Sequence, residues 1–268
     1  MRDSYNREIN YLRISVTDRC NLRCIYCMPA SGVRRIRHDE ILSFEEIIAI
    51  AREASRLGVS KIRLTGGEPL VRKNIAFLIR SLKTIAGIRE VSLTTNGVLL
   101  SGLAGEIRSA GLDRINISLD SIDPERYRAI TRNGNIRDAL RGIDAALAAG
   151  FAWIKINMVL LPGVDRSEVE GMERFCRQKG LELQRINHYS LNRPKTSRPR
   201  YEAERPLACT ECNRIRLTAD GKLKACLFSN TEFPVDQSDI RGSLERTIRN
   251  KPRRGIFCSN RQNWQIGG

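Results

Sequence analysis

The segment Tyr11-Leu12-Arg13-Ile14-Ser15-Val16 predicts a β-strand, and a cysteine-rich loop begins shortly after it at Cys20. Apolar and polar residues alternate along Leu12 to Val16, which is the two-residue period of a strand. Amphipathic, helix-like stretches follow, and they alternate with further β-rich runs at 60–65, 90–95, 114–119, 153–160 and 182–186. Repeated alternation of strand and helix predicts a parallel sheet covered by helices.

Chain length decides what kind of parallel sheet to expect. A closed eight-unit barrel takes about 250 residues, whereas the alternation here occupies about 180, from residue 8 to residue 190. We therefore expect an α/β fold, an incomplete TIM-like β/α barrel of about six units, over residues 1–190. Residues 192–206 are rich in Pro, Arg, Ser and Glu and predict a linker or exposed loop. Residues 191–268 hold four of the eight cysteines and predict a small C-terminal domain.

The composition restricts location and partners. The 46 Lys and Arg against 30 Asp and Glu give a net charge of +16, which suits nucleic acid, anionic lipid or a polyphosphate substrate. The basic residues are scattered through periodic segments, so we do not favour a nucleic-acid partner. The longest apolar run, 145–154, is about half of the ~20 residues that a membrane span needs. The first six residues lack the apolar stretch of a signal peptide, which predicts a cytoplasmic protein without a membrane partner. A homodimer is left open.

Cys20, Cys24 and Cys27 form a C-x3-C-x2-C set directly after the first predicted strand. In a reducing compartment such thiols are metal ligands more often than disulfides, and clustered thiolates select zinc or an iron–sulfur cluster. A zinc site closes with a fourth ligand, but neither His38 nor His188 lies within ten residues of this set. Three thiolates can instead bind three irons of a [4Fe–4S] cluster and leave the fourth iron open. A structural zinc knuckle is the alternative.

The stretch Cys20-Asn21-Leu22-Arg23-Cys24-Ile25-Tyr26-Cys27 resembles the signature of the radical S-adenosylmethionine (SAM) enzymes. Gly66-Gly67-Glu68-Pro69, after the second predicted strand, is similar to the GGEP motif of that family. The resemblance implies that the open iron binds SAM and that an electron cleaves it to a 5′-deoxyadenosyl radical. Small residues would let the backbone approach the ligand, and the carboxylate could accept from the SAM ammonium. The residues that match SAM contacts of the family are Tyr26, Gly66, Gly67, Glu68 and Ser118.

A second set, Cys209-x2-Cys212-x13-Cys226, lies near the C-terminus, with Cys258 further on. Taken alone, this spacing is typical of a zinc ribbon. Beside a radical SAM motif it favours an auxiliary [4Fe–4S] cluster. Cys209 to Phe228, and the terminal Gly267-Gly268, resemble the C-terminal motifs of the GTP 3′,8-cyclase family of molybdenum cofactor synthesis (the MoaA family).

The second resemblance implies a radical SAM lyase that cyclises GTP between the ribose C3′ and the guanine C8, in molybdopterin biosynthesis. It implies two [4Fe–4S] clusters, SAM, and an external reductant of flavodoxin or ferredoxin type. Cys20, Cys24, Cys27, Cys209, Cys212 and Cys226 would hold the metals, and the first three together with Arg214 and Arg216 would serve catalysis. The residues matched to GTP or a related polyphosphate are Arg13, Arg63, Thr94, Lys155, Arg214, Arg216, Gly267 and Gly268.

Elementary chemistry supports the cationic part of this set. Arginine binds phosphate oxygens in a bidentate manner, and Arg13, Arg63 and Lys155 lie on three different predicted strands that could converge inside one barrel. A cation facing that interior would be costly without an anionic partner. The alternative is that these side chains point outward.

Three features depart from the cyclase pattern. The segment between the barrel and the second cysteine pair is short; the usual R-F-I-E-x-M is replaced by Gln184-Arg185-Ile186-Asn187-His188-Tyr189; and Cys258 could close the auxiliary cluster. Arg185 could substitute for the family's arginine, but a shift of one residue turns a strand side chain to the opposite face. Two alternatives therefore stay open: a shortened radical SAM paralogue acting on a peptide or another nucleotide, and a zinc-ribbon nucleic-acid binder.

Overall fold

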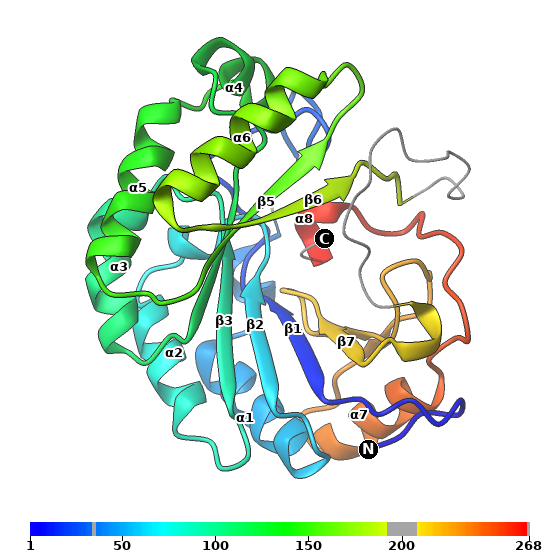
Figure 1. Ribbon diagram of the computed structural model, residues 1–268. Helices are drawn as coiled ribbons and strands as arrows, with labels where there is room; N and C mark the ends of the chain where they lie inside the picture. Colours follow the sequence, from blue (N-terminus) through cyan, green and yellow to red (C-terminus); the bar gives the residue numbers. More distant parts are fainter. Residues whose placement is uncertain (34–35, 192–207, 267–268) are drawn as a thin grey trace.

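A computed structural model describes residues 1–33, 36–191 and 208–266 of the protein. Within these residues nine strands form one sheet in the order β6-β5-β4-β3-β2-β1-β7-β8-β9 (Figure 1). Neighbours from β6 to β7 are parallel, and β8 and β9 are antiparallel. The strands are β1 (Tyr11–Ser15), β2 (Lys61–Thr65), β3 (Glu90–Thr95), β4 (Arg114–Ser118), β5 (Ile154–Leu160), β6 (Glu182–Asn187), β7 (Arg214–Leu217), β8 (Lys222–Lys224) and β9 (Phe233–Pro234).

All six strands predicted for the barrel are present, with ends that differ by about one residue. The connections between them are helical, as expected: α1 (Phe44–Arg56), α2 (Ile75–Lys83), α3 (Leu100–Ser109), α4 (Pro124–Thr131), α5 (Ile136–Ala148) and α6 (Arg166–Lys179). The C-terminal part adds α7 (Ile240–Arg249) and α8 (Asn263–Ile266). The capping box of Ser43 and Glu46 starts α1, and the Asp123 side chain accepts from the Arg126 N–H at the start of α4, as the sequence predicts.

Each parallel strand has one apolar and one polar face. Leu12 and Ile14 of β1 are fully buried in the main core, which the helices share, while Arg13 and Ser15 lie on the opposite face. Figure 1 shows α2, α3 and α5 along the outside of the sheet and α8 on its other side, where α8 contacts β1. A sheet with helices on one face leaves its polar face available to line an interior.

The C-terminal part joins the same sheet. β7 pairs in parallel with β1, which places Arg216 beside Arg13 and Arg214 beside Tyr11. The division into domains at residue 190 stays a prediction, and the sheet crosses it. None of the helices in the described ranges is long and apolar enough to span a bilayer.

Candidate active site

The first cysteine set lies in the loop after β1. The N–H groups of Cys27 and Met28 both donate to the Cys24 carbonyl, at 2.9 and 3.0 Å, so the loop folds into a tight turn. Cys20, Cys24 and Cys27 are free thiols. Burial raises the pKa of Cys24, with smaller contributions from Asp120 and the two other cysteines, and burial followed by Cys20 raises the pKa of Cys27 to about 12. Three partly buried free thiols in one loop are the ligand type of an iron–sulfur cluster, whose binding would displace their protons.

Gly66 and Gly67 hold this loop against the end of β2. A Cβ on Gly66 would lie 2.3 Å from the Thr17 carbonyl oxygen, and one on Gly67 would lie 2.3 Å from the Arg19 carbonyl oxygen. The Gly67 and Glu68 N–H groups donate to those same carbonyls, at 2.9 and 2.8 Å. The glycines therefore allow a close approach of two backbones, which positions the residues leading into Cys20.

Glu68 is buried, with 1% of its surface exposed. Its Oε1 accepts from the Leu70 N–H and the Thr95 hydroxyl, at 3.0 and 2.7 Å, and its Oε2 accepts from the Asn96 N–H at 2.7 Å. Burial raises its pKa to about 7 despite these donors. Its contact with a SAM ammonium stays a prediction; in the structure the carboxyl group connects β2 to the end of β3.

Tyr26 meets a carboxylate that the sequence analysis missed. The Tyr26 hydroxyl donates to Asp120 Oδ2 at 2.8 Å, and Asp120 Oδ1 accepts from the Val159 N–H at 2.8 Å. Burial raises the pKa of Asp120 to about 6 and that of Tyr26 well above its ordinary value. Asp120 follows β4 two residues after Ser118, and its place at the carboxyl end of a parallel strand was the available signal. Ser118 lies at the end of β4, in register with Asn157.

Three of the predicted phosphate ligands lie on neighbouring strands. Arg13 is in register with Arg63 on β2 and with Arg216 on β7. Arg13 and Arg216 are 9% and 6% exposed. Burial lowers the pKa of both, and nearby arginines lower it further, Arg216 and Arg63 for Arg13 and Arg214 for Arg216. The outward orientation considered above is therefore wrong for Arg13, and the neighbouring cations on this face suit an anionic ligand.

Uncharged neighbours orient the guanidinium group of Arg63. Its Nε donates to the Ser92 hydroxyl at 3.3 Å, and its Cζ lies 5.6 Å from the centre of the Tyr11 ring. With its amide oxygen turned toward Arg63, Asn116 accepts from both terminal guanidinium nitrogens at 3.1 Å. Lys155 differs, because its Nζ forms an ion pair with Glu182 Oε1 at 2.6 Å.

Two polar atoms on the same interior face lack a partner. Thr94 Oγ1 on β3 and Asn157 Oδ1 on β5 are buried without a hydrogen bond in the part of the chain that the structure describes. Buried polar atoms in folded proteins nearly always have a partner, so both fit contacts to a bound ligand. Thr94 was predicted; Asn157 was missed, although it lies two residues after Lys155 on the same strand face.

A buried lysine lies beside two cysteines of the second set, Cys212 and Cys226. Lys251 Nζ donates to the carbonyls of Arg214 and Ala225, at 2.7 and 2.6 Å, and also contacts the Cys212 thiol. Burial alone would raise the pKa of Cys212, but Lys251 and nearby groups lower it below its ordinary value. A Cβ on Gly255 would lie 2.4 Å from Cys226 Sγ. Spacing between cysteines did not reveal Lys251, which lies 25 residues beyond Cys226.

The thiol of Cys258 is engaged with a neighbour in its own segment. Its thiol donates to Asn260 Oδ1 at 3.2 Å and its N–H to the Leu191 carbonyl at 2.6 Å. It packs in a small apolar cluster with Leu191 and Ile266. It behaves as a small buried apolar residue.

The C-terminal helix α8 reaches both halves of the site. Arg216 Nη1 donates to the Ile266 carbonyl at 3.1 Å, and the Trp264 N–H meets the Cys27 thiol. Gly267 and Gly268, predicted to contact substrate, lie outside the described residues.

Arg185 does not join the interior. It is in register with Met158 on β5 and forms an ion pair with Glu173 Oε1 of α6, at 3.0 Å. The hypothesis that it substitutes for an interior arginine is wrong, because the one-residue shift turns it to the helical face.

No three His, Cys, Asp or Glu side chains among the described residues are arranged to hold one metal ion.

Residues 14–176 match the model of the radical SAM superfamily. The chain is 42% identical to a GTP 3′,8-cyclase of Moorella thermoacetica, over 91% of this chain and 87% of that protein. It is 39% identical to a GTP 3′,8-cyclase of Petrotoga mobilis, over the full length of both.

Solved structures show the same fold at low identity. Native anSMEcpe with bound AdoMet superposes with a TM-score of 0.69 at 15% identity, over 92% of this chain and 82% of that chain. Streptococcus suis SuiB also superposes with a TM-score of 0.69, at 16% identity, over 88% of this chain and 67% of that one. The expected partial-barrel α/β fold is thereby confirmed. The chain belongs to the radical SAM superfamily and, within it, to the family of the GTP 3′,8-cyclases.

Proposed function

We propose that the protein is a GTP 3′,8-cyclase of molybdenum cofactor biosynthesis, a radical SAM enzyme that converts GTP to its 3′,8-cyclised dihydro form. The observation that carries this proposal is the pair of buried arginines on β1 and β7, Arg13 and Arg216, in a chain about 40% identical to named cyclases. Adjacent cationic side chains on one face suit a polyanion, and a triphosphate supplies several negatively charged oxygens.

Cys20, Cys24 and Cys27 would hold a [4Fe–4S] cluster, and Tyr26, Gly66, Gly67, Glu68 and Ser118 would surround SAM. The cluster and SAM, when bound, supply a strongly hydrogen-abstracting adenosyl radical. The chain contributes the position of these groups: the glycine contacts fix the approach to Cys20, and Asp120 fixes the ring of Tyr26 through a 2.8 Å hydrogen bond.

Arg13, Arg63 and Arg216 would bind the triphosphate, with Arg214 and Lys155 at the edges of the same face. Thr94 and Asn157 offer buried oxygen atoms to the nucleoside part. Because the Arg63 guanidinium is already oriented by Ser92 and Asn116, little conformational entropy would be lost when a phosphate binds.

Cys209, Cys212 and Cys226 would hold an auxiliary [4Fe–4S] cluster with one iron open to the guanine. The engagement of the Cys258 thiol with Asn260 supports three ligands rather than four. Gly267 and Gly268 would complete the substrate side, and a flavodoxin- or ferredoxin-like protein would supply electrons. A cytoplasmic location and a homodimer stay predictions.

An anaerobic assay of the reconstituted protein with SAM, reductant and GTP tests the function. We expect 5′-deoxyadenosine together with a cyclised guanine–ribose product. Formation of 5′-deoxyadenosine that no guanine nucleotide accelerates, with no cyclised product, would contradict GTP as the substrate and point to a paralogue acting on a peptide or another nucleotide.

A further inference from the structure

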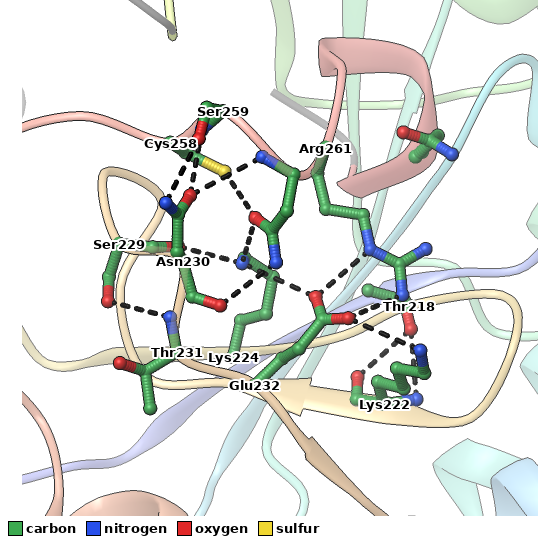
Figure 2. Close-up of polar contacts among 12 residues, drawn as sticks. Thr218, Lys222, Lys224, Ser229, Asn230, Thr231, Glu232, Cys258, Ser259 and Arg261 are labelled. Atoms are coloured by element: carbon green, nitrogen blue, oxygen red, sulfur yellow. Dashed lines mark hydrogen bonds and ion pairs between the residues drawn. The ribbon is translucent and has the colours of Figure 1, made fainter.

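Arg261 belongs to an ionic network in the C-terminal part, in which Glu232 joins it to Lys222 and Lys224 (Figure 2). Its Nη1 and Nη2 donate to the two carboxylate oxygens of Asp220, at 3.1 and 2.8 Å. Its Nε and Nη2 donate to the two carboxylate oxygens of Glu232, at 3.0 and 2.9 Å. One guanidinium, 7% exposed as a residue, thus joins two carboxylates with bidentate geometry, which fixes direction as well as distance.

The same network includes strand β8. Glu232 also lies 3.4 Å from Lys222 Nζ and 3.5 Å from Lys224 Nζ. Lys224 is fully buried and donates to the Ser229 carbonyl at 2.8 Å. β8 ends two residues before Cys226, so the contacts of Arg261 with Asp220 and Glu232 attach the C-terminal segment to the hairpin that leads to a proposed cluster ligand.

The residues before Arg261 have their own attachment. The Ser259 N–H donates to Asn230 Oδ1 at 2.8 Å, and Asn260 Nδ2 donates to the Asn230 carbonyl at 2.9 Å (Figure 2). After Arg261, Gln262 forms two hydrogen bonds within its own turn. Its N–H donates to Gln265 Oε1, and its carbonyl accepts from the Gln265 N–H. Arg261 is therefore the last side-chain attachment to the β8 region before α8 begins.

Helix α8 cannot position itself. It has four residues, Asn263–Ile266, and helices that short are not stable in isolation. Yet it lies beside both halves of the candidate site: the backbone N–H of Trp264 is near the Cys27 thiol, and the Ile266 carbonyl accepts from Arg216 Nη1 at 3.1 Å. The placement of α8 must be imposed by its neighbours.

We propose that Arg261 is a positioning residue that sets α8 across the interior of the barrel, between the SAM side and the nucleotide side, and so couples radical formation to the reaction of the substrate. The proposal rests on the proposed function. Arg261 acts through α8 and touches neither set of predicted ligands. With the network intact, α8 shields the side of Cys27 that Trp264 covers and keeps Arg216 oriented; without it, both effects weaken.

The test compares Arg261→Gln with Arg241→Gln in the reconstituted holoenzyme. Arg241 is an exposed residue of α7 whose ion pair with Glu245 at 3.2 Å is removed in the same way, so it is the matched control. Arg261→Lys keeps the charge but cannot bind both carboxylates in a bidentate manner, and should give an intermediate result. The Arg261→Lys variant also provides the comparison if Arg261→Gln does not assemble its clusters.

Three measurements are made anaerobically: hydrogen exchange over residues 258–266, 5′-deoxyadenosine formed without substrate, and 5′-deoxyadenosine formed per cyclised product. For Arg261→Gln we expect faster exchange in α8, more substrate-free cleavage of SAM, and about tenfold more 5′-deoxyadenosine per product, because small displacements at a reacting site cost one to two orders of magnitude. Iron content should match that of the control.

Faster exchange with unchanged cleavage and coupling would overturn the proposal, because Arg261 would then serve local stability alone. Unchanged exchange would overturn it as well. If the wild type forms no cyclised product, the proposed function fails separately, and substrate-free cleavage of SAM in the variants still decides the role of Arg261.

Discussion

At the scale of single residues, the site depends on side chains that are small or uncharged as much as on those that react. Gly66 and Gly67 occupy places where any Cβ would lie within 2.3 Å of backbone oxygen. Glu68 sits in a pocket of three donors with a pKa raised by burial. A single substitution that adds one methyl group or removes one charge can change each of these features.

Gly67→Ala should weaken assembly of the first cluster. The new methyl group would meet the Arg19 carbonyl, and overpacking of this kind costs about 1–3 kcal/mol. We expect lower iron content and little SAM cleavage, measured by iron analysis and 5′-deoxyadenosine formation. Gly102→Ala in α3 is the control, because its Cβ would meet nothing within 4 Å, and it should stabilise the helix by about 0.5–1 kcal/mol. Full iron content in Gly67→Ala would contradict the expectation.

Glu68 should make the metal-free protein less stable as pH rises. Its pKa is about 7 in the folded state against an ordinary value of 4.5, so between these values the unfolded chain has released a proton that the folded chain keeps. The unfolded state then binds fewer protons, and the free energy of unfolding falls as pH increases through this window. Urea unfolding of the wild type and Glu68→Gln, between pH 4 and 8 under reducing conditions, measures the difference. The wild type should lose stability relative to the variant across the window; parallel curves would contradict this.

At the scale of elements, strand register decides which cationic side chains lie next to one another on the sheet. Arg13, Arg63 and Arg216 lie at one level of three adjacent strands, on the face away from the helices. Arg185 lies on a strand of the same sheet but faces α6. The two orientations provide a matched pair of substitutions.

Arg63→Gln should weaken GTP binding by about 1.5–3 kcal/mol, the range for hydrogen bonds to charged groups, and leave SAM binding unchanged. Arg185→Gln, which removes an equal charge from the helical face, should change neither affinity appreciably. Isothermal titration of the anaerobic protein with each ligand provides both values. Equal losses in the two variants would show that net charge, rather than the interior position, determines nucleotide affinity.

Substitution of Cys258 tests whether this residue, in the loop before α8, is a ligand of the proposed auxiliary cluster. Because its thiol packs with Leu191 and Ile266 and donates to Asn260, Cys258→Ala should keep both clusters and lose only a modest amount of stability. Cys226→Ala should lose the auxiliary cluster. The wild type is measured separately: its electron paramagnetic resonance spectrum should show nitrogen couplings from bound GTP on the auxiliary cluster. Couplings that appear only in Cys258→Ala would mean that Cys258 closes the native cluster.

At the scale of the whole molecule, the arginines that contribute to the net charge of +16 fall into two groups, one exposed on helices and one buried on the interior face of the sheet. Exposed pairs such as Arg166–Glu170 and Arg241–Glu245 lie on helices and contribute little to stability. The interior arginines lower one another's pKa, and a bound polyanion would offset that repulsion. The molecule as a whole should therefore respond to a polyphosphate.

GTP should stabilise the protein against unfolding, and guanosine should do so much less. At a GTP concentration about 100 times its Kd, linkage adds about 2.7 kcal/mol. Thermal unfolding with GTP, guanosine and random duplex DNA compares the three. Stabilisation by DNA with strong salt dependence, and none by GTP, would favour the nucleic-acid alternative.

The sequence by itself determined the local features: the strands with their two-residue period, the caps of α1 and α4, the spacing of both cysteine sets and the GGEP turn. These depend on interactions between residues close along the chain, so they can be found without knowing the fold. The orientation of Arg13 and Arg63 did not follow from the sequence, which left an inward and an outward placement open; burial and register in the folded sheet decide it.

Only the tertiary structure decided which distant segments meet. Pairing of β7 with β1 brings Arg216 beside Arg13 from more than 200 residues away. The contacts of Asp120 with Tyr26, Lys251 with Cys212 and Arg261 with Asp220 likewise join separate segments. No periodicity encodes such contacts, since they arise when the whole sheet assembles and buried charged groups must find partners. The same assembly turned Arg185 outward and drew α8 into the site.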